Sequence, residues 1–482
     1  MLEDIISERK QKLQKWSKFF DPYPARVKRD FTLQTLVENF FVLQKKQKKI
    51  FITGRVMGIR DQGGIIFCDL KDESGGLQLI LSKKDTLHFQ LLKETLDIGD
   101  FLEANGILYL TKKGEKSLLA KKALIIVKTL RPLPKEWYGI EDTETRLRQR
   151  YLDSLLNPEV REIFKKKSVF WQTVRDFLKK EGFLEVDNPV LENVPGGAET
   201  EPFVTHLNAL NEDFYLRISL ELPLKKMLVG GFEKVFEIGK IFRNEGIDRE
   251  HLQDYIQMEV YWAYSDYNQM MKLVQTMYRQ IVKNVCGKLN TLWNNQTIYW
   301  GKPWPKLEYF DLFKKYNGID LHRATLDDLR KRAKALNLEL DANFGKGRLI
   351  DLIYKKTIRP HLIQPSFLIN PPVEIEPLAK RMAKDKQKVE RFQIMAMGTE
   401  LGKGFSELND PIDQKERFEE QMKLRKRGDK EAQMMNEDFV EALEYGMPPA
   451  SGFGMSERLF AVLMNLPVRE AQYFPLMRKK EK

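Results

Sequence analysis

The spacing of apolar and polar residues changes along the chain, and each change predicts a different kind of element. Residues 2–20 place apolar side chains at helical spacing among basic ones, which predicts an amphipathic helix that ends before Pro22. Five short apolar runs follow, at 50–59, 64–70, 76–82, 101–110 and 118–128. They predict five strands, with a helix at about 84–96 after the third strand. That order is typical of an OB-fold barrel, which often binds single-stranded nucleic acid.

A second pattern begins after the linker at Pro132 and Pro134. Asn157 followed by Pro158 predicts the start of a long amphipathic helix that ends at Gly182. Extended segments are predicted over 183–264, a helix over 265–290, and strands again over 366–408. A charged helix near 411–428, a glycine-rich strand and a helix after Glu457 complete the pattern. Strands and helices without regular βαβ alternation predict an α+β fold with an antiparallel sheet.

Composition narrows the class of function. Lys and Arg number 81 and Asp and Glu 69, and the net charge of +12 indicates a polyanionic partner or serves solubility alone. The 42% of apolar residues argues against disorder, and no stretch is long and apolar enough to span a bilayer. The N-terminus lacks an apolar signal region, and Cys68 and Cys286 are isolated. We therefore expect a cytoplasmic protein without disulfides or a cysteine-based zinc site, and with no membrane partner.

The basic residues of the first helix leave two interpretations open. Five of them follow one another closely: Arg9, Lys10, Lys12, Lys15 and Lys18. They form either a solvated face or an arm that follows the phosphates of a nucleic acid. The pattern does not favour one over the other.

The stretch 235–264 carries the clearest chemistry. Two alternating strands flank a polar loop, and in the first of them Glu237, Gly239, Ile241 and Arg243 share a face. In the second strand Tyr255, Gln257, Glu259 and Tyr261 share a face. Arg243 suits a phosphate or a carboxylate, and Tyr255 suits a purine ring. For a lone hairpin, however, a solvated face with cross-strand salt bridges is the better interpretation.

Longer motifs favour a binding site over a solvated sheet face. FRNEG at 242–246 and the strand end EVYWAY at 259–264 resemble motif 2 of class II aminoacyl-tRNA synthetases in their lysyl form. VPGGAETEPF, PPVEIEPLAKR, GKGFSELNDPIDQ and EALEYGMPPASGFGMSERLF resemble the same family. The likeness covers about residues 10–478. It implies an N-terminal basic helix at 1–30, an anticodon-binding OB-fold at 31–135 and a class II catalytic domain at 136–482, with helices flanking its antiparallel sheet.

The resemblance also implies an activity. L-Lysine would be activated with ATP and Mg²⁺ to lysyl-adenylate and transferred to the 3′ end of tRNA(Lys) by a homodimer, with Pro189 at its interface. Arg243 and Arg458 would act on the phosphates, and the other implied ATP contacts are Glu245, His251, Tyr255 and Glu400. Glu400 and Gln393 would hold the metal. The implied lysine contacts are Gly197, Glu221, Glu259, Tyr261, Lys403, Phe405 and Glu407. The implied anticodon contacts are Phe67, Gln78 and Arg55, although strand order alone favours Phe67 as barrel core.

Charge supports lysine as the amino acid. Glu259 and Glu407, flanked by Tyr261 and Phe405, suit a cation on an apolar stem. An aspartyl- or asparaginyl-type enzyme shares the layout, but aspartate would be repelled by these carboxylates.

Three departures from the family pattern support a further alternative. Lys403 stands where the family usually has asparagine, and Gln393 stands where it has a magnesium-binding glutamate. Motif 3, at 452–458, is one residue shorter and lacks a glycine. The alternative is a non-catalytic RNA-binding or regulatory paralogue.

Overall fold

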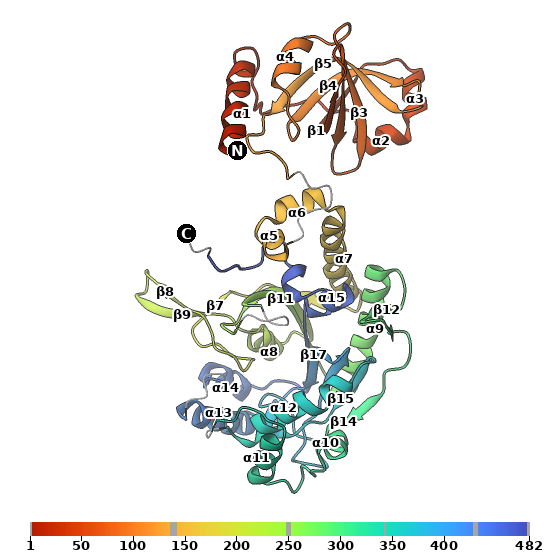
Figure 1. Cartoon of the computed structure of the whole chain (residues 1–482). Helices are drawn as coiled ribbons and strands as arrows, with labels where there is room; N and C mark the ends of the chain where they lie inside the picture. The colour runs from red at the N-terminus through yellow and green to blue at the C-terminus, as the bar shows by residue number, and fades with distance from the viewer. Residues whose placement is uncertain (1, 135–141, 247–251, 342–343, 428–431, 480–482) are drawn as a thin grey trace. The chain divides into compact units, whose positions relative to one another are not determined.

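The structure is a computed structural model and describes residues 2–134, 142–246, 252–341, 344–427 and 432–479. The chain folds into two compact units, Met1–Gly139 and Ile140–Lys482 (Figure 1). Within the described residues, no helix has the length and apolar character that crossing a bilayer requires. Cys68 and Cys286 are both unpaired.

The first unit is built on a closed barrel with the strand order β1-β2-β3-β5-β4. Its strands are β1 (Ile50–Asp61), β2 (Ile65–Lys71), β3 (Gly76–Ser82), β4 (Phe101–Leu110) and β5 (Lys116–Val127). The helices α2 (Leu33–Glu38) and α3 (Phe40–Lys45) precede the barrel, and α4 (Phe89–Thr95) follows β3. Ile66, Cys68 and Leu70 alternate into the interior, as the pleat of a strand requires. The OB-fold prediction is confirmed, although α4 is shorter than the helix expected at 84–96.

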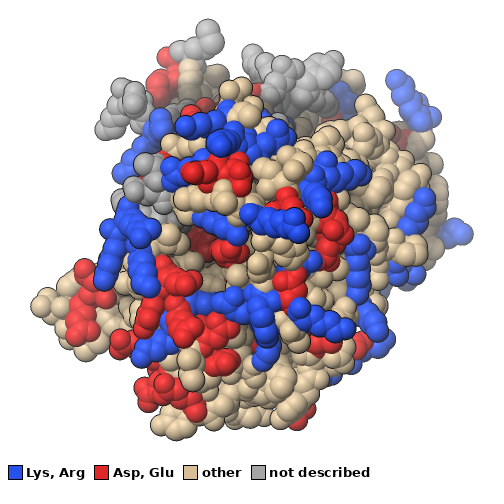
Figure 2. All heavy atoms as spheres, turned by 90° about the horizontal axis from the view of Figure 1, so that it is seen from below, with Lys and Arg blue, Asp and Glu red and all other residues tan. Residues whose placement is uncertain are grey.

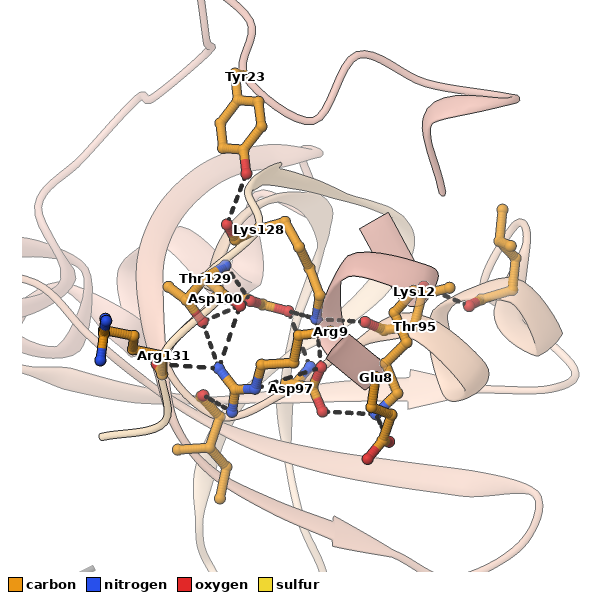
Figure 3. Close-up of polar contacts among 12 residues, drawn as sticks. Glu8, Arg9, Lys12, Tyr23, Thr95, Asp97, Asp100, Lys128, Thr129 and Arg131 are labelled. Atoms are coloured by element: carbon orange, nitrogen blue, oxygen red, sulfur yellow. Dashed lines mark hydrogen bonds and ion pairs between the residues drawn. The ribbon is translucent and has the colours of Figure 1, made fainter. Parts of the chain in front are cut away.

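Helix α1 (Leu2–Ser17) packs on the barrel through its basic residues as well as through the buried Trp16. Arg9 donates to Thr129 Oγ1 at 2.8 Å and to the carbonyl of Ile98 at 3.0 Å, and Lys12 pairs with Asp97 at 2.8 Å (Figure 3). Lys15 pairs with Glu94, whereas Lys10 and Lys18 are exposed. Arg9 and Lys12 therefore hold the helix to the barrel, whereas Lys10, Lys15 and Lys18 face solvent.

A buried lysine lies beneath this helix. Lys128, directly after β5, donates to Asp97 at 2.5 Å, to Asp100 at 2.7 Å and to the carbonyl of Thr95 at 2.6 Å (Figure 3). We call Lys128, Asp97, Asp100 and Arg9 the Lys128 cluster. Every charge in it has a charged or hydrogen-bonding partner, which is the condition for burying ions at tolerable cost.

The second unit contains an eight-stranded sheet. Its strands, in spatial order, are β14 (Lys306–Glu308), β15 (Ser366–Ile369), β16 (Arg391–Ala396), β17 (Thr399–Ser406), β18 (Ala450–Ser456), β11 (Asp254–Ala263), β10 (Lys234–Phe242) and β6 (Leu184–Glu185). Only the outermost pairs, β14 with β15 and β10 with β6, are parallel. The α+β prediction with an antiparallel sheet is confirmed.

Helices cover the two faces of this sheet differently. On one face α7 (Pro158–Lys180) and α9 (Tyr267–Cys286) pack against alternate strand residues such as Phe236, Met258 and Val260. On the other face one helical group packs at the β10–β11 end and a second at the β15–β16 end. The first group is α8 (Glu221–Val229), α13 (Pro411–Lys426) and α14 (Glu437–Glu444), and the second is α10 (Tyr309–Asn317), α11 (Leu326–Ala335) and α12 (Lys346–Thr357). The middle of this face is left open for a site.

Smaller elements complete the unit. They are α5 (Thr143–Arg148), α6 (Arg150–Leu156), α15 (Arg458–Leu463), the strands β7 (Leu191–Glu192), β8 (Val204–Leu207), β9 (Glu212–Leu216), β12 (Asn290–Trp293) and β13 (Gln296–Tyr299), and the 3₁₀ turns η1 (Arg359–His361), η2 (Val373–Ile375) and η3 (Val468–Ala471). Pro158 begins α7 as predicted, but the side chain of Asn157 donates to Asp153 at 2.7 Å instead of capping the helix.

One helix was not predicted. Extended segments dominate 183–264 as predicted, in β6 to β11, but the region also contains α8. Pro223 lies in the first turn of that helix, where its missing N–H costs nothing, and Leu224 and Leu228 are buried at helical spacing. The helix places Glu221 and Lys225 one turn apart on the same side.

Candidate functional site

A cavity of about 920 Å³ lies over the open middle of the sheet. Twelve of the residues predicted for the site line it: Gly197, Glu221, Arg243, Glu245, Tyr255, Glu259, Tyr261, Gln393, Glu400, Lys403, Phe405 and Arg458. Antiparallel pairing brings them together, because Glu237 faces Glu259 and Lys403 faces Gly454 across adjacent strands. Of the other predicted residues, Glu407 is buried behind the wall, and His251 lies outside the described residues.

Glu259 is held firmly at one end of the cavity. Its Oε1 accepts from Ser219 Oγ at 2.6 Å, from the backbone N–H of Leu220 at 3.0 Å and from Gln257 Nε2 at 2.5 Å. Its Oε2 accepts from the hydroxyl of Tyr261 at 2.9 Å. A carboxylate with four donors is held in one orientation, so its position in the cavity is fixed.

A buried lysine lies beside that end. Lys225 pairs with Glu221 at 2.5 Å and with Glu407, and its ammonium group is 5.2 Å from the centre of the Phe405 ring. Neither oxygen of Glu407 has a hydrogen-bond partner of good geometry among the described residues, although Oε2 forms the ion pair with Lys225. Glu221, Lys225 and Glu407 are named the Lys225 cluster.

Burial shifts the pKa values in this cluster. It raises the pKa of Glu221 to about 7, although Lys225 opposes the shift. Burial also raises the pKa of Glu407 well above its usual range. Burial alone would lower the pKa of Lys225, but Glu221 and Glu407 outweigh it and raise that pKa. The cluster therefore favours a charged lysine, whereas burial favours the protonated form of each carboxylate.

Two glycines keep this end open. Gly197 has φ +86°, and a Cβ there would lie 2.8 Å from both the Cβ of Glu221 and the Oγ of Ser219. A Cβ on Gly452 would overlap both Glu407 Oε1 and the ring of Tyr261. Side chains are excluded at both positions because the carboxylates and the ring approach the backbone closely.

Arginine and aromatic groups lie at the other end. The guanidinium of Arg243 lies 5.8 Å from the centre of the Tyr255 ring, and its Nε donates to the carbonyl of Ile218 at 3.2 Å. Glu245 accepts from Thr200 Oγ1 at 2.7 Å. Arg458 lines the same cavity and donates to the carbonyl of Glu400 at 3.5 Å. An arginine pair and an aromatic ring in one cavity are suited to a nucleoside phosphate.

The predicted metal ligands interact with each other. Gln393 Nε2 donates to Glu400 Oε2 at 2.5 Å, across the hairpin of β16 and β17. No cluster of three or more His, Cys, Asp or Glu side chains suited to a metal occurs in the described part of the chain. Mg²⁺ at phosphate sites needs only one or two carboxylates together with the substrate's own phosphates. Glu400 therefore fits one such ion, whereas Gln393 turns its amide N–H toward Glu400 and is a poor second ligand.

Lys403 is paired with another buried carboxylate of the cavity wall. Its ammonium group pairs with Glu376 Oε2 at 3.1 Å, and Arg391 Nε approaches the same oxygen at 3.3 Å. Two cations share one buried carboxylate, so this part of the cavity carries a net positive charge.

The geometry agrees with the sequence motifs, and the comparisons with known proteins decide the family. Residues 142–478 match the model of tRNA synthetases class II (D, K and N), and residues 50–126 match the model of the OB-fold nucleic acid binding domain. The chain belongs to the class II tRNA synthetases.

Curated relatives of this class II synthetase match it over its full length. The lysine–tRNA ligase of Moorella thermoacetica is 41% identical over 99% of this chain and 98% of its own length. The lysine–tRNA ligase of Roseiflexus castenholzii is 40% identical over 100% of both chains, and that of Thermotoga maritima is 40% identical over 100% of this chain and 97% of its own.

The barrel of this synthetase carries the three residues predicted for anticodon contact on its outer face. Phe67 is half-buried and points away from the interior that Cys68 fills, so the alternative of barrel core is wrong. Gln78 accepts from Ser117 Oγ at 3.0 Å, and the guanidinium of Arg55 lies 4.3 Å from the centre of the Phe101 ring. Pairing of Asp69 with Gln78 and of Lys71 with Arg55 puts all three on adjacent strands.

Net charge gives little guidance to the location of a nucleic-acid surface. Figure 2 shows Lys and Arg side chains intermixed with Asp and Glu side chains over the face in view, with no broad area of a single sign. The net charge of +12 is therefore not gathered into one patch there.

Pro189 is exposed and lies outside the cavity. Apolar side chains near it are also exposed, with Leu184 at 49% and Leu191 at 45%. An exposed apolar group of this kind is compatible with a contact between protein chains.

Sequence reasoning missed several residues that shape the site: Ser219, Lys225, Gln257, Glu376 and Arg391. Strand alternation placed Gln257 on the same face as Glu259, but it gave Gln257 no role. Nothing in the pattern pointed to Lys225, because lysine is ordinarily a surface residue and its helix was not predicted.

Proposed function

We propose that this class II synthetase is a lysyl-tRNA synthetase. It would activate L-lysine with ATP to lysyl-adenylate and then transfer the lysyl group to the 3′ end of tRNA(Lys). The observation that carries the proposal is the cavity itself, with Glu259 and the Lys225 cluster at one end and Arg243 with Tyr255 at the other. Names of full-length relatives at about 40% identity support it.

Activation requires positioning and charge neutralisation rather than a covalent enzyme intermediate. An oxygen of the lysine carboxylate attacks the α-phosphorus of ATP, and the bond to pyrophosphate breaks. Arg243 would contact both the carboxylate and the α-phosphate, Arg458 would contact the γ-phosphate, and Tyr255 would stack on the adenine. Glu245 and His251 would contact the adenine and the phosphates. A Mg²⁺ ion on Glu400 would neutralise phosphate charge when bound.

The amino-acid end would bind both ammonium groups of lysine. Glu221 and the backbone at Gly197 would receive the α-ammonium group. Glu259 and Glu407 would receive the ε-ammonium group, with Tyr261 and Phe405 lining the apolar stem of the substrate. Lys403 would add positive charge near the substrate carboxylate.

Transfer would need tRNA in the same enzyme. In the second reaction a ribose hydroxyl of the tRNA attacks the lysyl carbonyl and AMP leaves. On the barrel, Phe67 would stack on an anticodon base and Gln78 would hydrogen-bond a base edge, with Arg55 beside them. We further propose a homodimer with Pro189 at its interface, acting in the cytoplasm.

The direct test is exchange of labelled pyrophosphate into ATP with each amino acid in turn. Lysine should support exchange, and aspartate and asparagine should not. The variant Arg243→Ala should lower the exchange rate by about 10²-fold or more, the usual effect of losing one group that stabilises transition-state charge. Exchange with aspartate or asparagine but not lysine would overturn the proposed specificity.

Two contacts favour a second candidate, a non-catalytic RNA-binding or regulatory paralogue. Gln393 donates a hydrogen bond to Glu400, and Lys403 forms an ion pair with Glu376. If this candidate is correct, the protein binds RNA while no amino acid supports exchange at any Mg²⁺ concentration.

A further inference from the structure

The Lys225 cluster contains more charge than a structural ion pair needs. Lys225 is fully buried, and it lies between Glu221, one turn earlier on α8, and Glu407, directly after β17. The rings of Phe405, Tyr261 and Phe439 surround its ammonium group at 5.2, 6.0 and 5.9 Å from their centres. A cation in such surroundings is stable only because two carboxylates accompany it.

Lys225 does not line the cavity, although Glu221, Tyr261 and Phe405 do. The side chain therefore lies behind the wall, where a bound amino acid would not touch it. Glu407 also lies behind the wall, but its Oε1 reaches the position where a side chain on Gly452 would lie, and Gly452 lines the cavity. An ammonium group in the cavity can therefore approach this oxygen, which has no hydrogen-bond partner of good geometry among the described residues.

Counting charges gives the role of the lysine. In their ionised forms, Glu221, Glu259 and Glu407 supply three negative charges around the amino-acid end, and Lys225 supplies one positive charge. The sum of these four charges is two negative charges. The two ammonium groups of the substrate lysine match this sum, and the substrate's carboxylate would contact Arg243. Beside them, Glu376 with Lys403 and Arg391 on it adds one net positive charge, which suits the carboxylate of the substrate.

We propose that Lys225 is a specificity-determining positioning residue, which cancels one of three buried carboxylate charges and holds Glu221 and Glu407 apart, so that the cavity accepts a substrate with two ammonium groups. This inference rests on the proposed function. Without Lys225 three carboxylates would share one buried space, and one of them would take up a proton and lose its orientation.

The test compares lysine activation by the wild type and by Lys225→Met, with KM and kcat of pyrophosphate exchange measured separately for lysine and for ATP. We expect the KM for lysine to rise by at least about 30-fold, the usual loss when one partner of a buried charge pair is removed, with the KM for ATP nearly unchanged. Lys225→Arg, which keeps the charge, should recover much of the affinity. Lys226→Met is the matched control, because Lys226 is the next residue of the helix and pairs with Asp438 at the surface.

A double variant separates charge balance from mere packing. Glu407→Gln alone leaves one negative charge, Lys225→Met alone leaves three, and the two together leave two again. If charge balance is the role, the double variant binds lysine better than Lys225→Met does, and the two effects are strongly non-additive. Additive losses, or a folded Lys225→Met enzyme with wild-type KM for lysine, would overturn the inference. Failure of the wild type to activate lysine at all would instead overturn the proposed function.

Discussion

Among the described residues, each unit has a lysine buried between two carboxylates, and the two clusters differ in how many of their groups have hydrogen-bonding partners. Lys128 donates to two aspartates and a carbonyl, and Arg9 and Lys12 from α1 add further partners (Figure 3). Lys225 has two glutamates, and one of them, Glu407, lacks hydrogen bonds of good geometry to described residues.

The difference indicates different roles. A buried ionic cluster with all of its groups paired stabilises one packing arrangement, here that of α1 on the barrel. A cluster with surplus carboxylate charge beside a cavity destabilises the empty protein and is ready for a cationic ligand. The first cluster should therefore contribute to stability, and the second to binding.

The largest expected effect comes from breaking the satisfied cluster. Lys128→Met leaves the buried Asp100 and the half-buried Asp97 without their central cation, so the free energy of unfolding of the first unit should fall by about 3–5 kcal/mol. Calorimetric melting of the full chain measures this. Lys121→Met, which breaks the half-exposed pair with Asp85, should cost less than about 1 kcal/mol. Equal losses in the two variants would contradict the comparison.

The unsatisfied cluster should respond in the opposite way. Glu407→Gln keeps the shape of the side chain and leaves Lys225 paired with Glu221, so the melting temperature should stay the same or rise. Lysine binding, measured by calorimetric titration, should weaken by at least about 2 kcal/mol because a carboxylate partner of the substrate is lost. Glu419→Gln, on the exposed side of α13, is the control. If Glu407→Gln lowers the melting temperature strongly and leaves the lysine affinity unchanged, the Lys225 cluster serves stability and not binding.

A third prediction separates the two units by reaction step. Phe67→Ala should weaken tRNA binding by about 1–3 kcal/mol, the usual value of one stacked base, while lysine-dependent pyrophosphate exchange stays at the wild-type rate. Aminoacylation of tRNA at varied tRNA concentration measures the first quantity. The control Tyr109→Ala removes another exposed ring of the barrel, and it should change neither the tRNA affinity nor the pyrophosphate exchange rate. A drop in exchange rate would show that Phe67 acts through folding.

The smallest expected effect is a pH dependence of lysine binding. The pKa of Glu221 is raised to about 7, and only its ionised form attracts an ammonium group. The KM for lysine should therefore fall as the pH rises from about 6 to about 8 and should level off above that range. The free energy of unfolding should change in the opposite direction. Between the usual glutamate pKa and about 7, Glu221 is protonated in the folded state but ionised in the unfolded chain, so its contribution to stability falls as the pH rises. A KM that rises with pH would contradict the assignment.

Much of the fold could be predicted because it depends on local pattern. Alternation of apolar residues located the barrel strands and the hairpin of β10 and β11. The same alternation put Glu259 and Gln257 on one face of β11. Helix α8 was missed because a proline such as Pro223 argues against a helix unless the proline lies in the first turn. Where this helix begins depends on the burial of Leu224 and Leu228, which is a tertiary property.

By itself, the sequence determined the family, the two-unit α+β architecture and the residue types at both ends of the cavity, because motifs and period-two alternation are local properties of a chain. Only the tertiary structure decided which charges face each other. Lys225 meets Glu407 across more than half of the second unit's sequence, and Gln393 meets Glu400 across a hairpin. Burial and ion pairing depend on distances in space, and a surface lysine and a buried one look the same in a sequence until the chain has folded around them.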